Sequence, residues 1–333
     1  MSVAHLVSLL RERGLIAADA APPPDGSDRP WFISLLMGIA GWVAGLFVLV
    51  FLAIALDLDQ HRQIAAAGVV LLAVAWALYA IGRGKVFVDQ LALALSIAGQ
   101  LAITIYLFES LRGALPITAA IFGMQVLLFV VMRDRVARTL AAFFASIAWV
   151  FVVRFFLRPD EGGSDIFGHD GGLRAPLLGA WTLPLEWALS WAPSVALILW
   201  LRRTETRWMA RAAAAFARPA ISGLLLGIAL GGIAAEPVSM LMFGLEEVGR
   251  TFDWWSLFPL LSIGLALFAA YNAFALRSSG LLGLAIVAAL AHLARFYYLY
   301  GTTLTVKSAI MLGAGLLLLG AGRLLARGAE ARA

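Results

Sequence analysis

The sequence predicts an all-α fold, a polytopic integral membrane helix bundle of about ten transmembrane helices with both termini in the cytoplasm. Three observations lead to this prediction. First, 62% of the 333 residues are hydrophobic and only 14% are charged, whereas a soluble domain has about 25% charged residues. Second, the apolar residues form runs of roughly 18–25, each long enough to cross the ~30 Å hydrocarbon layer as a helix. Third, basic residues are dense and sparse in alternate loops, as expected for loops on two sides of a membrane.

Three regions follow from the apolar pattern. Residues 1–30 are expected to form a short cytoplasmic amphipathic helix and a Pro-rich linker. Residues 31–322 form the transmembrane domain, and residues 323–333 form a cytoplasmic tail. Ten spanning segments are predicted from hydropathy: Trp31–Leu56, Ile64–Ile81, Leu91–Phe108, Leu115–Met132, Thr139–Leu157, Pro184–Leu201, Ala220–Phe243, Ser256–Leu276, Leu281–Tyr300 and Thr302–Gly322.

The basic residues predict the orientation, because cytoplasmic loops retain Lys and Arg. Seventeen of them fall in the N-terminal region, the alternate loops and the C-terminal tail. Five fall on the opposite side: Arg62, Arg112, Arg158, Arg174 and Arg250. This split places both ends in the cytoplasm. The sixth segment is the weak point of the count, because it contains Pro184 and Pro193.

Tryptophans on the predicted outer side fit an aromatic belt at the level of the headgroups. They are Trp181, Trp187, Trp191, Trp254 and Trp255.

Several function classes find no support in the sequence. The net charge of +5 comes from Arg residues between apolar runs, so it indicates an oriented membrane protein rather than a nucleic-acid binder. The chain has no Cys, and no zinc-protease, P-loop or nucleophile-elbow pattern is present. The acidic loop between Arg158 and Arg174 does not match the spacing of an EF-hand, so a solvated loop is favoured over a metal site. No cofactor is predicted, and catalysis is the minority interpretation.

Glycines at four-residue spacing mark candidate faces for helix packing. Gly223, Gly227 and Gly231 lie in the seventh segment, and Gly41 and Gly45 lie in the first. Without side chains, such faces allow two helix backbones to approach closely. Packing is therefore the favoured interpretation of these glycines.

Six ionisable residues fall inside the predicted segments, where a charge is costly and usually faces protein or a water-filled cavity. At a rise of ~1.5 Å per residue, three of the four with an estimated depth lie about 21–24 Å from the cytoplasmic start of their helices, and Lys307 lies about 8 Å from the outer start of its own. They therefore fall together in the outer half of the bilayer. The primary candidates for a ligand site are Glu236, His292, Arg295 and Lys307, and the secondary ones are Arg154 and Glu186.

Local sequence supports a site around Glu236. Pro237 lacks the N–H that would bond the carbonyl of Ile233, and Gly231 and Gly232 precede it, so a helix kink is expected beside the carboxylate. Such irregular backbone is tolerated at membrane depth only inside protein or along a cavity. His292 and Arg295 share a helix face because they are three residues apart. Lys307 lies in the first turns of its helix, where the dipole disfavours a cation, so an anionic partner is expected.

A structural alternative stays open at this point. Glu236 would then pair with Arg295 or Lys307 to hold helices together. Arg154 and Glu186 would extend to the outer headgroups.

The C-terminal stretch resembles a known family. Ala294 to Ser308, with Arg295-Phe296-Tyr297-Tyr298 and Lys307-Ser308, is followed by the Gly-rich and Leu-rich run 310–322. This stretch resembles the closing hairpin of an uncharacterised bacterial polytopic membrane family, domain-of-unknown-function family 4401, over the last nine segments. The stretch Leu6 to Ile16 resembles the N-terminus of domain-of-unknown-function family 2157. The resemblance implies a polytopic fold and a partnership with membrane proteins of the GDYXXLXY type, and it supplies no reaction.

The leading hypothesis is a bacterial inner-membrane protein with a polar pocket open to the outer leaflet. This pocket binds or transports an anionic or zwitterionic ligand, with His292 and Arg295 in contact with the ligand and Glu236 and Lys307 balancing charge. The alternative is a non-catalytic scaffold that holds a partner protein through its glycine faces and its tryptophans. A membrane-embedded transferase is the third hypothesis.

Overall fold

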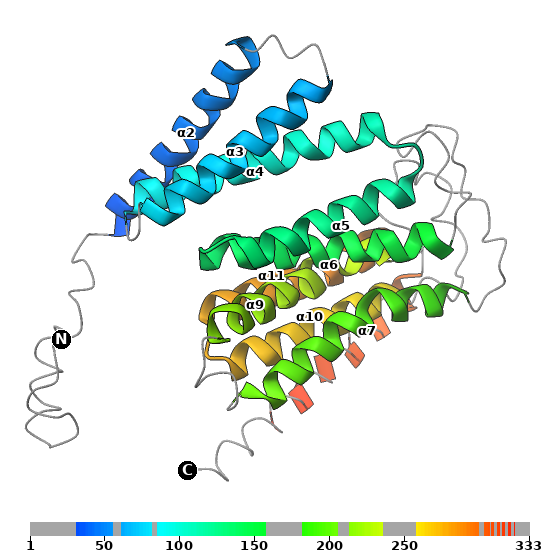
Figure 1. Ribbon diagram of the computed structural model, residues 1–333. Coiled ribbons are helices and arrows are strands. Elements are labelled where there is room, and N and C mark those ends of the chain that lie inside the picture. The colour runs from blue at the N-terminus through cyan, green and yellow to red at the C-terminus, as the bar shows by residue number, and fades with distance from the viewer. Residues whose placement is uncertain are drawn as a thin grey trace, which may run out of the picture. The chain divides into compact units, whose positions relative to one another are not determined.

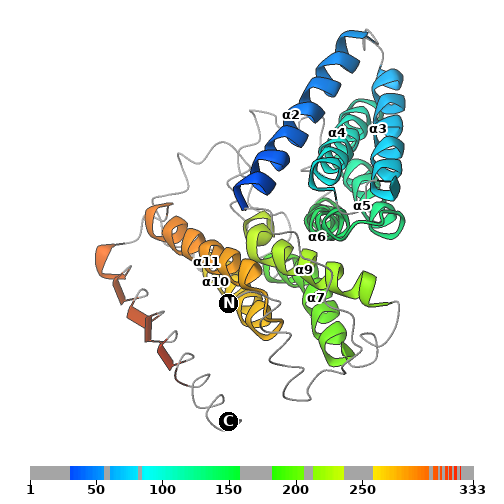
Figure 2. The same ribbon diagram turned by 90° about the vertical axis from the view of Figure 1, so that its left-hand side faces the viewer.

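The computed structural model describes residues 31–55, 61–81, 85–157, 182–205, 213–235 and 258–299, with scattered residues between 303 and 323. Within these ranges all regular structure is helical, which agrees with the predicted all-α class. Figures 1 and 2 show the helices in two views. Their bounds are α2 Trp31–Ala55, α3 His61–Ile81, α4 Val86–Ser110, α5 Ala114–Val131, α6 Arg135–Leu157, α7 Thr182–Arg203, α9 Ala214–Leu230, the 3-10 helix η2 Gly231–Ala235, α10 Phe258–Ala275 and α11 Ser279–Leu299.

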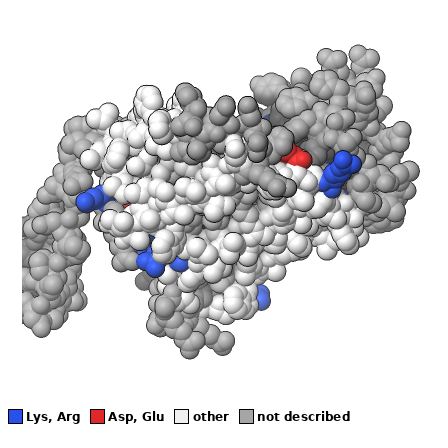
Figure 3. Space-filling view, turned by 45° about the horizontal axis from the view of Figure 1, so that its top comes forward, with Lys and Arg blue, Asp and Glu red and all other residues white. Residues whose placement is uncertain are grey.

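Among the described residues, six helices are long and apolar enough to cross a membrane, namely α3 to α7 and α11. Three shorter apolar stretches accompany them: Leu36–Val48, Ala214–Leu230 and Leu260–Ala275. Many large apolar side chains face outward, among them Phe47, Phe51 and Phe156, each about 70% exposed. On the face in Figure 3, charged atoms appear at only a few places on an otherwise uncharged described surface. Exposed apolar side chains in this number are typical of a surface that contacts lipid or another protein, and not of a surface that contacts water.

The helices match the predicted segments closely in the first six cases and depart from them in the seventh. The sixth segment is one continuous helix, α7, which contains Pro193. The seventh was expected as one helix from Ala220 to Phe243, whereas α9 begins at Ala214 and ends at Leu230, and the described residues that follow it, Gly231–Ala235, form the 3-10 helix η2. Residues 236–257 lie outside the described part of the chain, as do residues 1–30 with the predicted amphipathic helix.

The contacts between Cα atoms divide the chain into two compact units. The first unit comprises Met1–Leu58 and Ala67–Gly99, and the second comprises Asp59–Ala66 and Gln100–Ala333. In the first unit, α2 lies against α4 through Gly41 and Gly45, where an added Cβ would meet Gln90 and Ala94. Gly99 of α4 similarly touches α3 at the Gly68 carbonyl. Small residues thus allow these backbones to approach closely.

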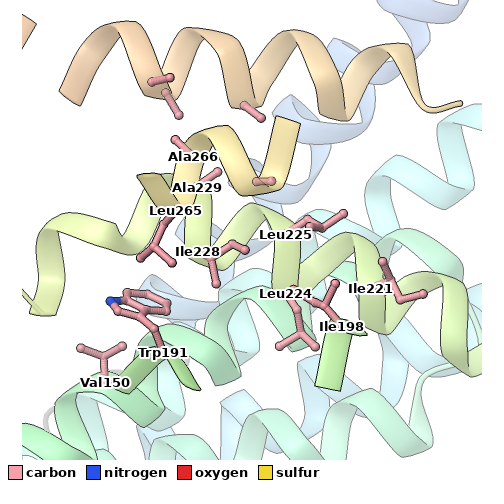
Figure 4. Packing of buried hydrophobic residues seen from close by; sticks show 14 of the residues in the cluster. Val150, Trp191, Ile198, Ile221, Leu224, Leu225, Ile228, Ala229, Leu265 and Ala266 are labelled. Carbon is pink, nitrogen blue, oxygen red and sulfur yellow. The ribbon is translucent and has the colours of Figure 1, made fainter. Parts of the chain in front are cut away.

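The second unit is built on two helix pairs and the helix between them. The pair α5 and α6, the pair α10 and α11, and the contact of α6 with α9 form its frame. Its apolar core contains Val150, Trp191, Ile198, Ile228 and Leu265, which come from α6, α7, α9 and α10 (Figure 4). Because α9 touches α6, α7, α10 and α11, it is the central helix of this unit.

Local chemistry explains where two of these helices begin and end. The carboxylate Oδ2 of Asp134 accepts the N–H groups of Val136 and Ala137 at 2.7 and 2.9 Å, so Asp134 caps the start of α6. At the end of α10, Arg277 has a φ of 54°, and the N–H of Ser278 reaches back to the carbonyl of Ala273. This left-handed residue closes the helix and lets α11 begin at Ser279.

Candidate functional site

The candidate site is built around the point where α9 loses its regular helical geometry. The α-helix ends at Leu230, and the five residues Gly231–Ala235 form the 3-10 helix η2. Gly231 and Gly232 disfavour a continued α-helix, and Pro237, just beyond the described residues, cannot donate to a helical carbonyl. The backbone is therefore irregular at the position where the sequence predicts a kink.

Two side chains from other helices bond backbone carbonyls on either side of this break. The Nε2 atom of His292 in α11 lies 2.7 Å from the carbonyl oxygen of Ala229. Nη1 of Arg154 in α6 donates to the carbonyl of Ala234 at 3.3 Å. Carbonyls near a change from α to 3-10 geometry lose part of their helical bonding and need other donors. His292 and Arg154 supply such donors from two helices far apart in sequence.

Helices α7 and α10 enclose the same segment. An added Cβ on Gly231 would meet Ile147 and the Cη2 atom of Trp191, and one on Gly232 would meet Ser262 at about 3.0 Å. Figure 4 shows the indole nitrogen of Trp191 pointing away from Ile228 and Ile198. Helices α6, α7, α10 and α11 therefore surround the break in α9.

Buried polar atoms without a hydrogen-bond partner in the described part of the chain occur on α7 and α11. They include Nδ1 of His292, Nε1 of Trp191 and Oγ of Ser190. Their residues are only 3%, 1% and 0% exposed, respectively. Because a buried polar atom without a partner costs about 1–3 kcal/mol, each indicates a bound group, a water or a residue beyond the described ranges.

Of the six predicted ionisable residues, four are described and all four are buried. His292 and Arg295 lie one turn apart on α11, with Arg295 9% exposed. Arg154 and Glu186 are 2% and 3% exposed. Both side chains are enclosed by protein, so the alternative in which they extend to the headgroups is wrong. Glu236 and Lys307 lie outside the described residues, and their predicted roles stay predictions.

The glycine face of α9 lies against α6. An added Cβ on Gly223 would meet the Thr139 carbonyl and Ala142, and one on Gly227 would meet Ser146. Gly231 continues the row at Ile147 of the same helix. These contacts keep α9 close to α6 and so bring η2 near Arg154.

A second helix irregularity, at Pro193, is held in the same way. Pro193 lies inside α7 and cannot donate to the carbonyl of Leu189. The indole Nε1–H of Trp149 in α6 donates to that carbonyl at 3.1 Å. Pro193 was visible in the sequence, but its partner on another helix was not.

Two arginines also differ from their predicted loop positions. Arg138 is one of the seventeen basic residues predicted to lie on the cytoplasmic side outside the spanning segments, yet it lies in α6 and is 8% exposed. Its Nε and Nη1 donate to the carbonyls of Met132 and Ala215 at 2.6 and 2.9 Å, and its guanidinium lies 3.9 Å from the ring centre of Phe216. Arg202, assigned to the next cytoplasmic loop, lies in the last turn of α7 and donates to Oδ1 of the buried Asn272 at 2.6 Å. The partners of Arg138 are backbone carbonyls and the partner of Arg202 is an asparagine 70 residues away, and neither can be recognised from the local sequence.

The tryptophans are distributed differently from an aromatic belt. Trp191, assigned to the outer belt, is 1% exposed and lies in the core of the second unit (Figure 4). Trp187 is half-buried, and Trp181, Trp254 and Trp255 lie outside the described residues. Trp191 therefore serves packing at the break rather than anchoring at a membrane surface.

Among the described residues, no group of three or more His, Asp or Glu side chains could hold a metal ion. The loop between Arg158 and Arg174 is outside those residues. The donor set around η2 consists of imidazole, indole, hydroxyl and guanidinium groups, and most of these donate hydrogen bonds. Such a set suits a ligand rich in acceptor oxygens.

The fold and the site indicate the class of protein to which this chain belongs. In its described residues the chain is helical, with six helices suited to membrane insertion and a broken helix inside its second unit. A family model described as Domain of unknown function (DUF4401) matches residues 30–258, more than half of the chain, so the protein belongs to this family. The family inferred from the sequence is thus confirmed, although the Arg295–Lys307 stretch that suggested it lies beyond the matched residues. The resemblance to family 2157 stays a prediction.

Comparison with curated proteins gave no match. Comparison with solved structures gave none either.

Proposed function

We propose that this protein is a bacterial inner-membrane protein that crosses the bilayer about ten times, with both termini in the cytoplasm. Six helices of spanning length, the apolar outer surface and the uneven division of Lys and Arg between alternate loops support this proposal. In this topology, η2 and the side chains around it lie in the outer half of the membrane.

We further propose that the protein binds, or moves across the membrane, an anionic or zwitterionic ligand at η2. The observation that carries this proposal is the state of His292. Since its Nε2 lies against the carbonyl of Ala229, Nε2 carries a proton. Nδ1 is then left for another partner: in the neutral ring it accepts from an N–H or O–H of the ligand, and in the doubly protonated ring it donates to a ligand oxygen. Nδ1 is buried without a partner in the described part of the chain.

The other groups around η2 favour a ligand with acceptor oxygens. Nε1 of Trp191 is an obligate donor, and Oγ of Ser190 is a hydroxyl that can donate. Arg154 and Arg295 contribute positive charge from α6 and α11. At membrane depth an arginine is retained mainly where it serves a pathway or a partner. Glu236 and Lys307 would balance this charge, as the sequence hypothesis holds.

The test is stabilisation of the detergent-purified protein by chain-free headgroups. Inorganic phosphate and phosphocholine are titrated while the unfolding temperature is followed. We expect at least one probe to raise this temperature in the wild type, because a ligand that binds only the folded state stabilises it. The rise should be lost in His292→Gln and Arg295→Gln.

An exposed arginine provides a matched control. Arg277→Gln removes a charge outside the site and should keep the full rise. A wild type that responds to neither probe, or a response retained in both site variants, would contradict ligand binding at η2.

The scaffold hypothesis was based on the glycine faces and the tryptophans, and the glycine faces no longer support it. The glycine faces lie against helices of the same chain, namely Gly223 and Gly227 on α6 and Gly45 on α4, so they are not surfaces for a partner. An interaction with a membrane protein of the GDYXXLXY type stays a proposal, which co-purification after mild detergent extraction would test.

A further inference from the structure

A groove in the second unit lies apart from η2. It has a volume of about 330 Å³ and is bounded by α5, α6, α7 and α9, which is within the range of roughly 300–1,000 Å³ found for ligand pockets. Phe122 and Phe129 of α5, Trp149 of α6 and Leu197 of α7 contribute its apolar walls. The rings of Phe122 and Trp149 lie 5.5 Å apart.

The floor of the groove is part of one continuous stripe along α6. Ala142, Ala145, Ser146 and Trp149 line it, and their spacing of three and four residues places them on one helix face. At ~1.5 Å per residue, this part of the floor is about 10 Å long. The groove therefore runs along the helix axis, as an extended hydrocarbon chain between spanning helices would.

The same stripe continues toward the start of α6 as two arginines. Arg138 precedes Ala142 by four residues, and Arg135 precedes Arg138 by three, so both lie on the groove face. Arg138 is buried against Phe216, whose ring is 6.2 Å from that of Phe129 in the groove wall. The stripe thus has a cationic end and an apolar remainder.

Arg138 and Arg135 have different roles at this end of the groove. The guanidinium of Arg138 already donates to the carbonyls of Met132 and Ala215, which fixes it at the end of the groove. Arg135 is exposed and can reach a ligand. The carboxylate of Asp134, the residue before Arg135, accepts the N–H groups of Val136 and Ala137 and so belongs to the helix cap.

We propose that this groove holds one acyl chain of an anionic phospholipid whose phosphate lies at Arg135, beside Arg138. An anionic amphiphile matches the surface at both ends, because its charged headgroup meets the arginines and its chain replaces water or empty space along Phe122, Phe129 and Trp149. The proposal rests on membrane insertion but not on ligand binding at η2. In the proposed orientation, the Arg135 end faces the cytoplasmic leaflet, which carries the anionic lipids.

The experiment counts lipids bound to the intact full-length chain by native mass spectrometry in mild detergent. Dioleoyl phosphatidylglycerol and dioleoyl phosphatidylcholine are compared, since their chains are identical and their headgroup charges differ. We expect tighter binding of phosphatidylglycerol in the wild type. Arg135→Gln should weaken it about fivefold, as expected for one basic residue worth ~1 kcal/mol near an anionic surface. The control Arg277→Gln should leave it unchanged.

A second variant tests the chain rather than the headgroup. Ala145→Trp fills the groove floor and should weaken both lipids about tenfold or more, because even two displaced methylenes are worth roughly 1.6 kcal/mol. The matched control, Ala73→Trp, adds the same side chain at an exposed position of α3 and should bind both lipids as the wild type does.

Three results would overturn the proposal. The first is equal binding of the two lipids in the wild type, and the second is identical lipid binding in Ala145→Trp and Ala73→Trp. The third is a wild-type dimer that Ala145→Trp dissociates without change in bound lipid, because a second copy would then occupy the groove. Loss of phosphate binding in His292→Gln leaves this proposal intact, so the two sites can fail separately.

Discussion

The two units of the chain show two ways of packing apolar helices. In the first unit, α2, α3 and α4 meet through small residues such as Gly41, Gly45 and Gly99. The hydrogen bond described there between side chains of different helices joins Nε1 of Trp42 to Oε1 of Gln90 at 3.2 Å. In the second unit, side chains repeatedly bond backbone carbonyls of another helix, as Trp149, Arg154, His292 and Arg138 do.

This difference follows from helix regularity. Helices α2, α3 and α4 have no internal break in their described residues, so their backbone carbonyls are hydrogen-bonded within each helix. In the second unit, Pro193 and the Gly231–Ala235 segment interrupt the ladder, and in a membrane the affected groups must find partners inside the protein. Arg154 and His292 are buried at one of these interruptions and bond its carbonyls. We locate the function in the second unit for this reason.

The largest expected effect comes from adding a methyl group where α9 packs closely against α6. In Gly223→Ala the new methyl group would meet the Thr139 carbonyl and the Phe143 amide nitrogen, both of which are backbone atoms. We expect a loss of about 2–3 kcal/mol in the free energy of unfolding, as for an overpacked core. The measurement is denaturant unfolding in detergent. Gly264→Ala is the control, because nothing lies within 4 Å of its added Cβ, and it should be neutral or slightly stabilising.

The next effect concerns the break itself. Arg154→Gln removes the donor to the Ala234 carbonyl, and an unpaired buried acceptor costs about 1–3 kcal/mol. Arg135→Gln, an exposed position on the same helix, should change the free energy of unfolding by less than about 0.5 kcal/mol. Equal effects of the two substitutions in the same unfolding assay would show that Arg154 does not hold η2.

A double-mutant cycle tests the bond at Pro193. Trp149→Phe keeps a ring in place but loses the donor to the Leu189 carbonyl, so we expect a cost of about 1 kcal/mol. Pro193→Ala restores a helical N–H for that carbonyl. In the Pro193→Ala background, Trp149→Phe should therefore cost almost nothing. Additive effects of the two substitutions would refute the link between them.

The smallest effect is expected in the first unit. Gln90→Leu removes the partner of the Trp42 indole, and polar contacts between membrane helices average about 0.6 kcal/mol. We expect a change in the free energy of unfolding of that size or less. A loss as large as that of Arg154→Gln would mean that the first unit also depends on polar contacts, and the contrast between the units would fail.

The sequence predicted the first six helices and an irregular backbone near Gly231 and Gly232, but not the contacts around that segment. Apolar runs and glycine or proline positions are local properties, so α7 and the interruption at Gly231 could be predicted from them. The bonds from Arg154 to Ala234 and from His292 to Ala229 join residues 80 and 63 positions apart. Their acceptors are backbone carbonyls, which carry no mark in the sequence. Arg138 was misplaced for the same reason.

The most direct test of the account is the protonation pattern of His292 in a bilayer. The chain has only four histidines, so ¹⁵N-histidine solid-state NMR can assign His292 by its loss in His292→Gln. The account predicts a proton on Nε2, bonded to the Ala229 carbonyl, and an Nδ1 resonance that moves when phosphate or phosphocholine is added. A proton on Nδ1 alone, or an Nδ1 resonance that neither probe changes, would contradict a ligand site at the break in α9.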